Sequence, residues 1–392
     1  MKSLGSIKTI LQKELREFVR DRRTLMLALV LGPLLTPAIM LGILSLAESR
    51  AKSQIEKPLD VPMVGAERAP NMVAWLAGQG IHRKAFQGDL DTAIRNQIED
   101  VYIRVGDDFQ KSWHEGEPAL VEIVHDSTRQ DSEIPVKRIE DALQRYGQQV
   151  GALRLLARGM NPGVAAPLAV SHKDLSTPEA RRGMVMAFLP YLLILSAFIG
   201  GAYLIIDTTA GERERQSLEP LLATPARRGA VVTGKIAAAC LVGFTSLLLT
   251  LMAFKVGAAF SPGIGRQMDV SMPAVAKMLM ILLPMLFIGT SLLTFIAAGA
   301  KSVKEAQSYM SVLMLMPMIP TIALMVSPVK NQLWMFAVPF LAQNQMLLKV
   351  VRGEGITMEQ WSVYLLAGFG LALVLWFAAT RRYHQERLAI SA

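Results

Sequence analysis

Long apolar stretches constrain this chain more than any other feature of its sequence. About 20 apolar residues suffice to cross a bilayer as a helix, which satisfies its own backbone hydrogen bonds where no water is present. Six stretches have this character: Leu25–Leu46, Val185–Ile206, Val231–Phe254, Val275–Gly299, Tyr309–Val326 and Trp361–Thr380. The chain is 52% hydrophobic with a mean hydropathy of +0.35. The sequence therefore predicts an all-α polytopic membrane protein with six transmembrane helices.

Basic residues gather at the ends of these stretches and predict their orientation. Lys and Arg accumulate in the cytoplasmic loops of membrane proteins. With six spans, four basic segments fall on one side, namely the leader 1–23, the loop 207–230, Lys301 with Lys304, and the tail 381–392. We therefore expect both termini to be cytoplasmic. This topology accounts for the net charge of +9 and predicts no nucleic-acid partner.

The leader itself is predicted to be an amphipathic helix that lies in the cytoplasmic interface. Its apolar residues recur at helical spacing, with basic residues between them, and they are Ile7, Ile10, Leu11, Leu15 and Phe18. A cleaved signal peptide over 1–47 is disfavoured, because the apolar stretch exceeds the 7–15 residues usual for such a peptide. The first transmembrane helix then occupies 24–46.

A soluble-type composition between the first two spans predicts an inserted domain at 47–182. Three short segments have strand character, "LDVPMVG", "EDVYIRVG" and "ALVEIVHDS", and helices are expected at Asp89–Glu99 and Glu133–Arg158. An α/β domain on the extracytoplasmic side follows. Its histidines lack metal-ligand spacing and Cys240 stands alone in the chain, so we expect no metal site.

The remaining boundaries follow from the same patterns. The second span is placed at 183–206, a cytoplasmic loop at 207–230 and the third to sixth spans within 231–380. Pro317 and Pro320 predict a kink in the fifth span. Near 328–357 the apolar character is too short and broken for a seventh span, which favours a re-entrant or external hairpin.

The stretch "AGERERQSLEPLLATPARRGAVVTGK", Ala210 to Lys235, is densely charged between two spans. Ser217 can cap a helix, Pro220 is tolerated in its first turn, and Pro225 ends it. The predicted short helix presents leucines between charged ends, which suits docking of a cytoplasmic protein; the alternative is a solvated loop that only enforces topology. The residues assigned to docking are Glu212, Glu214, Leu218, Glu219, Leu222, Pro225, Arg227 and Arg228.

A second pattern in this stretch imitates a nucleotide site. Gly229 to Lys235 matches GxxxxGK, but Ile236 occupies the position of the Ser or Thr that holds magnesium, and no strand precedes it. We therefore expect no ATP hydrolysis by this chain, which also lacks a catalytic constellation.

The same loop carries a family resemblance. It resembles the cytoplasmic signature of bacterial ABC exporter permeases of the second membrane-domain class (ABC-2), particularly the NatB-like sodium-extrusion branch. "AAGAKSVKEAQSYM", Ala297 to Met310, is similar to that family's segment between the fourth and fifth spans. The order of elbow helix, first span, external domain and five further spans resembles the family architecture.

The resemblance implies a permease of the bacterial cytoplasmic (inner) membrane that pairs with a separate ABC ATP-binding subunit. ATP and Mg would be bound by that subunit, and no cofactor by this chain, which would not be an enzyme. The loop would be the coupling element of alternating access. Two membrane domains would line one pathway, as a homodimer or as a heterodimer with a sister permease, surrounded by membrane lipids.

Cargo is implied to be sodium by resemblance, but the spans carry no Asp or Glu away from their ends, which favours a lipid-like or amphipathic cargo as the alternative. A third alternative is a membrane receptor or assembly factor that senses a ligand through its external domain. Polar side chains within the spans are the candidates for a substrate pathway, and those selected are Tyr191, Ser196, Tyr203, Thr290, Ser291 and Thr294.

Overall fold

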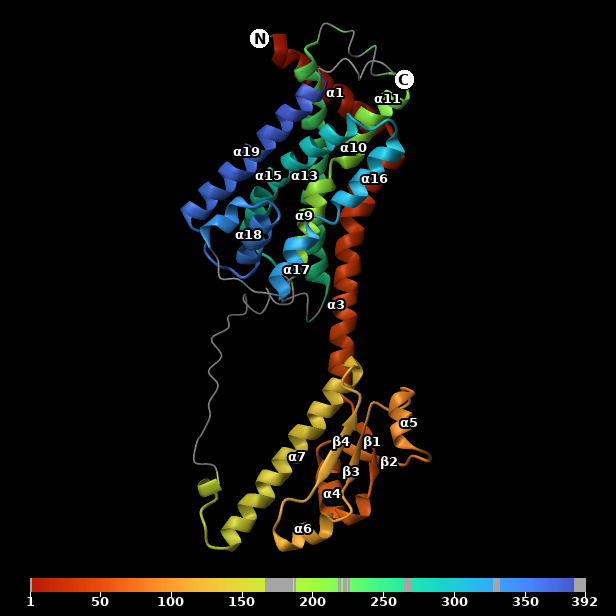
Figure 1. The fold of residues 1–392 in the computed structure, drawn as a ribbon, viewed down its shortest axis with the longest axis vertical. Helices are drawn as coiled ribbons and strands as arrows, with labels where there is room; N and C mark the ends of the chain where they lie inside the picture. Colours follow the sequence, from red (N-terminus) through yellow and green to blue (C-terminus); the bar gives the residue numbers. More distant parts are fainter. Residues whose placement is uncertain are drawn as a thin grey trace. The chain divides into compact units, whose positions relative to one another are not determined.

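The computed structural model forms two compact units (Figure 1). It describes residues 2–165, 186, 188–217, 220, 224, 226–261, 263, 269–326 and 332–383. The helical unit comprises Met1–Ser45 and Leu175–Ala392, and the α/β unit comprises Leu46–Asp174. The α/β unit overlaps the segment 47–182 in which composition predicts an inserted domain.

Among the described residues, six helices are long and apolar enough to cross a membrane. They cover Arg22–Glu56, Leu189–Glu214, Arg228–Phe260, Met272–Ala297, Val303–Leu324 and Met358–Tyr383, and so match the six predicted stretches. Their elements are α2 (Arg22–Leu25), η1 (Met26–Leu31), α3 (Gly32–Glu56), α9 (Leu189–Ile199), α10 (Ala202–Ile206), η4 (Asp207–Gly211), α11 (Glu212–Glu214), α13 (Arg228–Phe260), α15 (Met272–Ala297), α16 (Val303–Leu313), α17 (Met318–Val326) and α19 (Met358–Tyr383).

Three details refine the predicted boundaries. Helix α3 continues to Glu56, past the expected end at Leu46, because "AESRAKSQIE" contains neither Gly nor Pro to stop it. The fifth span, where Pro317 and Pro320 predict a kink, is divided into α16, which ends at Leu313, and α17, which begins at Met318. The segment after it forms the short helices η5 (Leu333–Ala337) and α18 (Leu341–Val351), neither of them long enough to span a membrane.

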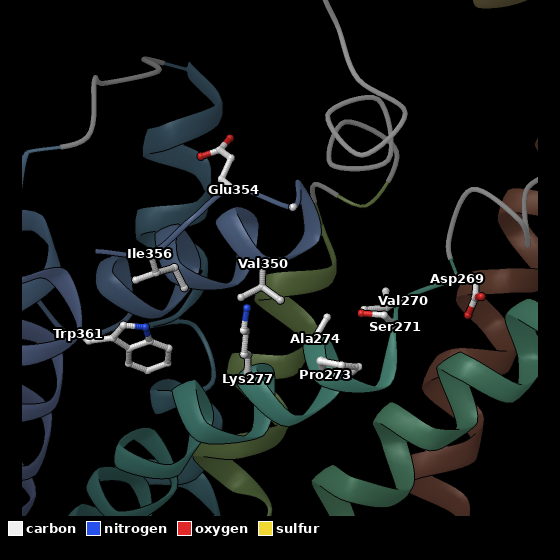
Figure 2. Close-up of a pocket in the computed structure, with 11 residues that line it drawn as sticks. Asp269, Val270, Ser271, Pro273, Ala274, Lys277, Val350, Glu354, Ile356 and Trp361 are labelled. Atoms are coloured by element: carbon white, nitrogen blue, oxygen red, sulfur yellow. The ribbon is translucent and has the colours of Figure 1, made fainter. Parts of the chain in front are cut away.

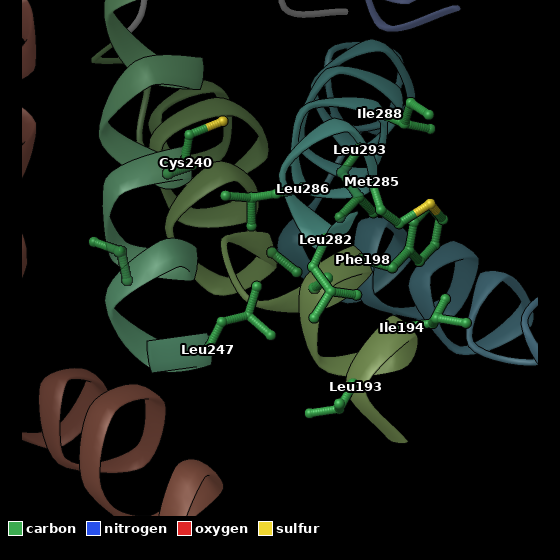
Figure 3. Close-up of a cluster of buried hydrophobic side chains, with 14 of the residues drawn as sticks. Leu193, Ile194, Phe198, Cys240, Leu247, Leu282, Met285, Leu286, Ile288 and Leu293 are labelled. Carbon is green, nitrogen blue, oxygen red and sulfur yellow. The ribbon is translucent and has the colours of Figure 1, made fainter. Parts of the chain in front are cut away.

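Glycines allow the central helices of the helical unit to approach closely. A Cβ at Gly289 of α15 would lie 2.3 Å from the carbonyl oxygen of Phe198 in α9, and one at Gly201 would lie 2.7 Å from the carbonyl oxygen of Ala239 in α13. Larger apolar side chains fill the space around these crossings (Figure 3). Without a hydrophobic force between helices in lipid, such close packing holds the bundle together.

The α/β unit contains a four-stranded sheet in the order β2-β1-β3-β4. Strand β1 pairs in parallel with β2 and β3, whereas β3 and β4 are antiparallel. The elements are β1 (Leu59–Val64), α4 (Pro70–Gly78), β2 (Ile81–Lys84), α5 (Leu90–Arg95), β3 (Val101–Val105), α6 (Phe109–Glu115), β4 (Val121–His125) and α7 (Gln130–Ala157). The three predicted strands and both predicted helices are present; β2 was missed because three of its four residues are charged or His and exposed.

Because α15 and α9 approach closely at Gly289, we expect a larger side chain at this position to destabilise the protein. Gly289→Ala forces a methyl group against the Phe198 backbone and should destabilise the protein by about 1–3 kcal/mol. Gly370→Ala in α19 is the matched control, because a Cβ there meets no atom within 4 Å and Ala favours a helix. Thermal unfolding in mild detergent should show a lower melting temperature for Gly289→Ala alone. Equal melting temperatures would contradict this packing.

Candidate functional site

A cluster of four charged residues, three of them buried, lies where α11 meets two other helices of the helical unit. It joins Lys13 and Glu14 of α1 (Lys2–Arg20), Glu212 of α11 and Lys235 of α13. The side chains of Lys235 and Glu14 are fully buried, and that of Glu212 is 8% exposed. We call these four residues the charge cluster.

Two carboxylates surround the Lys235 ammonium. It donates hydrogen bonds to Glu212 Oε2 and to the backbone carbonyl oxygen of Thr208, and it lies 3.8 Å from Glu14 Oε1. Lys13 Nζ donates to Glu212 Oε1 at 2.9 Å and to Glu14 Oε1 at 3.3 Å. Two positive and two negative charges therefore offset each other, as buried charges require; Lys235, Glu14 and Glu212 are removed from water, whereas Lys13 is 38% exposed.

The sequence of α1 explains how Glu14 becomes buried. Ile10 and Phe18 lie one turn before and one turn after it on the same helix face, and both are buried. Gly234 of α13 faces this side of α1: a Cβ at Gly234 would lie 2.7 Å from Ile10 Cγ2. The apolar face of α1 thus packs on α13 and carries Glu14 inward, beside Lys235.

Burial and charge shift the two α1 groups. Burial raises the pKa of the Glu14 carboxyl, although the ammonium groups of Lys235 and Lys13 oppose this rise. Burial opposes the charge of Lys13, yet its hydrogen bond to Glu212 and the surrounding carboxylates raise the pKa of its ammonium above the usual range. Lys13 therefore stays charged, whereas Glu14 is the group in the cluster with a disfavoured negative charge.

The next predicted docking residue, Glu214, ties the loop to a second segment. Its Oε2 accepts a hydrogen bond from the Val303 backbone N–H at 2.8 Å, at the first turn of α16, and Arg213 donates to the Ala300 carbonyl oxygen at 3.2 Å. A carboxylate is favourable at a helix N-terminus. The two segments that carry the family resemblance, Ala210–Lys235 and Ala297–Met310, are therefore in contact.

The other predicted docking residues divide into two groups. Arg227 occupies the N-cap position of α13 without a side-chain capping hydrogen bond, and Arg228 at the start of the helix donates to the Tyr383 carbonyl oxygen of α19 at 3.3 Å. Leu218, Glu219, Leu222 and Pro225 lie outside the described residues, so the short docking helix stays a prediction. The backbone before it is irregular: η4 is π-helical, and Gln216 has φ +57°.

The apparent nucleotide motif lies within a regular helix. Gly229–Lys235 belongs to α13, so its backbone N–H groups are engaged in helical hydrogen bonds and form no phosphate loop. The sequence patterns include Lys235 as the end of this motif and assign no role to Glu14. The signal that could have revealed Glu14 is its place between Ile10 and Phe18, an acidic residue on an apolar face.

The predicted substrate-pathway residues do not gather at one site. Tyr191 and Ser196 belong to α9, Tyr203 to α10, and Thr290, Ser291 and Thr294 to α15. The Thr290 and Thr294 hydroxyls donate to carbonyl oxygens one turn back, at 2.8 and 2.6 Å, which is a common structural use of Thr in membrane helices. Tyr203 is 48% exposed.

Ser291 is the pathway candidate that borders a large groove. The groove has a volume of about 720 Å³ and lies between α13, α15 and α19, which contribute Thr233, Ile236, Ala237, Phe287, Ser291, Leu365, Leu366, Phe369, Gly370, Ala372, Leu373 and Trp376. The Trp376 indole N–H donates to the Thr233 hydroxyl, so that polar pair is satisfied internally. The groove is therefore suited to an apolar occupant.

A second cavity of about 470 Å³ lies at the start of α15 beside the end of α18 (Figure 2). Lys277 and Trp361 border it, together with the carboxylates of Asp269 and Glu354. Asp269 is paired with Lys255 at 2.9 Å. Among the described residues, no group of three or more His, Cys, Asp or Glu side chains is arranged to hold a metal ion.

Comparisons with known proteins agree with the sequence resemblance. The family model described as "ABC-2 family transporter protein" matches residues 22–379. The chain is also 29% identical over 355 residues to the protein named ABC transporter permease protein NatB from Bacillus subtilis (strain 168). This similarity covers 88% of the chain and 89% of the relative.

The burial of Lys235 predicts a large effect of removing its charge. Lys235→Met leaves Glu14 and Glu212 with a deficit of positive charge away from water and should cost about 3–5 kcal/mol. Lys255→Met is the matched control, because Lys255 is 27% exposed and Asp269 is 56% exposed, so this pair is partly solvated and should contribute about 0–1 kcal/mol. Thermal unfolding in mild detergent measures both. Similar melting temperatures for the two variants would show that Lys235 is not buried with its partners.

Proposed function

This chain belongs to the ABC-2 family of transporter proteins, and we propose that it moves cargo out of the cytoplasm using ATP hydrolysed by a separate subunit. It is a multi-pass membrane permease of an ABC transporter. Family membership over residues 22–379 decides against the receptor or assembly-factor alternative, since the match includes both the spans and the inserted domain.

The anchoring of the loop carries this proposal. Glu212 enters the charge cluster and Glu214 accepts a hydrogen bond from the first N–H of α16, so the start of the loop is tied to α1, α13 and α16 at once. A partner that displaces the loop would therefore act on three helices. We propose that the ATP-binding subunit docks on the leucines that follow, and that its closure on ATP reorients the bundle from cytoplasmic to outward access.

The assembly follows from the family and from topology. We propose that both termini are cytoplasmic and that the α/β unit lies outside the cytoplasm, and the basic residues at the helix ends support this orientation. The partner would bind ATP and Mg, and two permease chains, identical or sister, would line one pathway within the lipid of the inner membrane.

Two cargoes are proposed on different grounds. Sodium is favoured by the resemblance to the NatB-like branch. An amphipathic or lipid-like cargo is favoured by the groove between α13, α15 and α19, whose lining is almost entirely apolar. A hard cation needs oxygen ligands, and a groove of this composition offers few.

Co-purification tests the proposed partnership. The tagged chain, extracted from its host in mild detergent, should bring down an ATP-binding subunit in stoichiometric amount, and Leu218→Asp/Leu222→Asp should abolish this because two charges replace the apolar docking surface. Leu153→Asp/Leu156→Asp is the matched control, since both leucines are exposed on α7 in the α/β unit. An ATPase that fails to accompany the unaltered chain would refute the exporter proposal.

Filling the groove separates the two cargoes. Gly370 borders the groove and a Cβ there meets no atom within 4 Å, so Gly370→Trp should occupy the groove without displacing neighbours. In vesicles containing the permease and its ATPase, ATP-driven movement of a fluorescent lipid analogue should fall at least tenfold if the groove carries cargo. If the unaltered permease transports radioactive sodium and Gly370→Trp transports it at the same rate, the result would support sodium as the cargo and reject the groove as its pathway.

A further inference from the structure

Only one of the two buried carboxylates in the charge cluster accepts a hydrogen bond from Lys235. Glu212 and the Thr208 carbonyl accept from Lys235, while Glu14 lies 3.8 Å away. Among the described residues, Glu14 and Glu212 are the carboxylates within 4.0 Å of Lys235. Glu14 Oε2 is buried and has no hydrogen-bond partner in the described structure.

Burying Glu14 in this arrangement costs folding free energy. A buried carboxylate oxygen without a partner is destabilising. Burial disfavours the negative charge of Glu14 and raises the pKa of its carboxyl, although the Lys235 and Lys13 ammonium groups oppose this rise. An uncharged residue between Ile10 and Phe18 would pack on α13 without this cost.

The two carboxylates differ in how firmly the backbone holds them. Glu14 lies within the regular 19-residue helix α1, and Lys235 within the 33-residue helix α13. Glu212 instead lies in a three-residue turn between the π-helical η4 and the positive-φ residue Gln216. Irregular π segments often occur at functional positions. Glu212 is therefore the partner that moves when the loop moves.

We propose that Lys235 passes from Glu212 to Glu14 when the loop is displaced, so that α1 is a moving contact of the coupling device and Glu14 is a positioning residue. This inference rests on the proposed function. When Glu212 withdraws, the buried ammonium needs another anion, and the Glu14 carboxylate is already close, with its Oε1 3.8 Å away and its Oε2 without a hydrogen-bond partner. Lys13 is 38% exposed, so its flexible side chain can follow Glu212. Two alternative pairings of the same four charges make a two-state element.

The test compares variants in the complete complex with its ATPase, in vesicles. Glu14→Gln keeps the size of the side chain and the Lys235–Glu212 pair, so the ATPase should still co-purify and the melting temperature should not fall. ATP-driven transport should fall at least tenfold, because the displaced state has lost its anion. Glu14→Asp should recover part of the rate. Glu17→Gln, one turn along α1, is the matched control: it removes only the solvated pair that Glu17, 57% exposed, makes with Lys13 at 3.4 Å, and transport should stay within twofold.

Each outcome decides the inference. Transport within twofold of the unaltered protein in Glu14→Gln would show that α1 is only an anchor. A melting temperature that falls together with transport, without recovery in Glu14→Asp, would assign Glu14 a structural role and also overturn the hand-over. If the unaltered chain brings down no ATPase, both proposals fail; if it does and Glu14→Gln transports normally, only the hand-over fails.

Discussion

The burial of the Lys235 ammonium is the constraint on which this end of the structure depends. A charge removed from water must be offset nearby, and here the offset comes from helix α1 and from the loop start. Satisfying Lys235 therefore fixes α1 against α13 and Glu212 against both. Apolar packing of Ile10 and Phe18 gives the contact its area, and the charges specify its register.

The loop is consequently held by two carboxylates that point to different parts of the bundle. Glu212 reaches the charge cluster, and Glu214 reaches the first turn of α16. Because Ala210–Lys235 and Ala297–Met310 are far apart in sequence but touch through Glu214, their joint resemblance to ABC-2 permeases has a physical basis. A force on the loop reaches helices on both sides of it.

Composition and periodicity were sufficient to predict the six spans, the α/β character of the segment between the first two of them, and most of its strands. Segments that are buried in lipid or in a core consist largely of apolar residues, so a short stretch of sequence identifies them. Strand β2 escaped because its exposed residues are not apolar. The charge cluster escaped for another reason: Lys13 and Glu212 are 199 residues apart, and a pairing over that distance leaves no periodic trace. Glu14 alone broke a local rule, as an acid on an apolar face.

Helix α13 donates hydrogen bonds to two irregular segments of the bundle. The π-helical segments η1 and η4 depart from the α-helical hydrogen-bond ladder, and carbonyl groups removed from water need donors. Ser246 donates to the Ala28 carbonyl oxygen of η1 at 3.1 Å, and Lys235 donates to the Thr208 carbonyl oxygen of η4. Both donors belong to α13. Lys235, which balances the buried carboxylates, thus also stabilises the irregular backbone of η4 that precedes Glu212. Its charge and its hydrogen bond both hold the start of the loop in place.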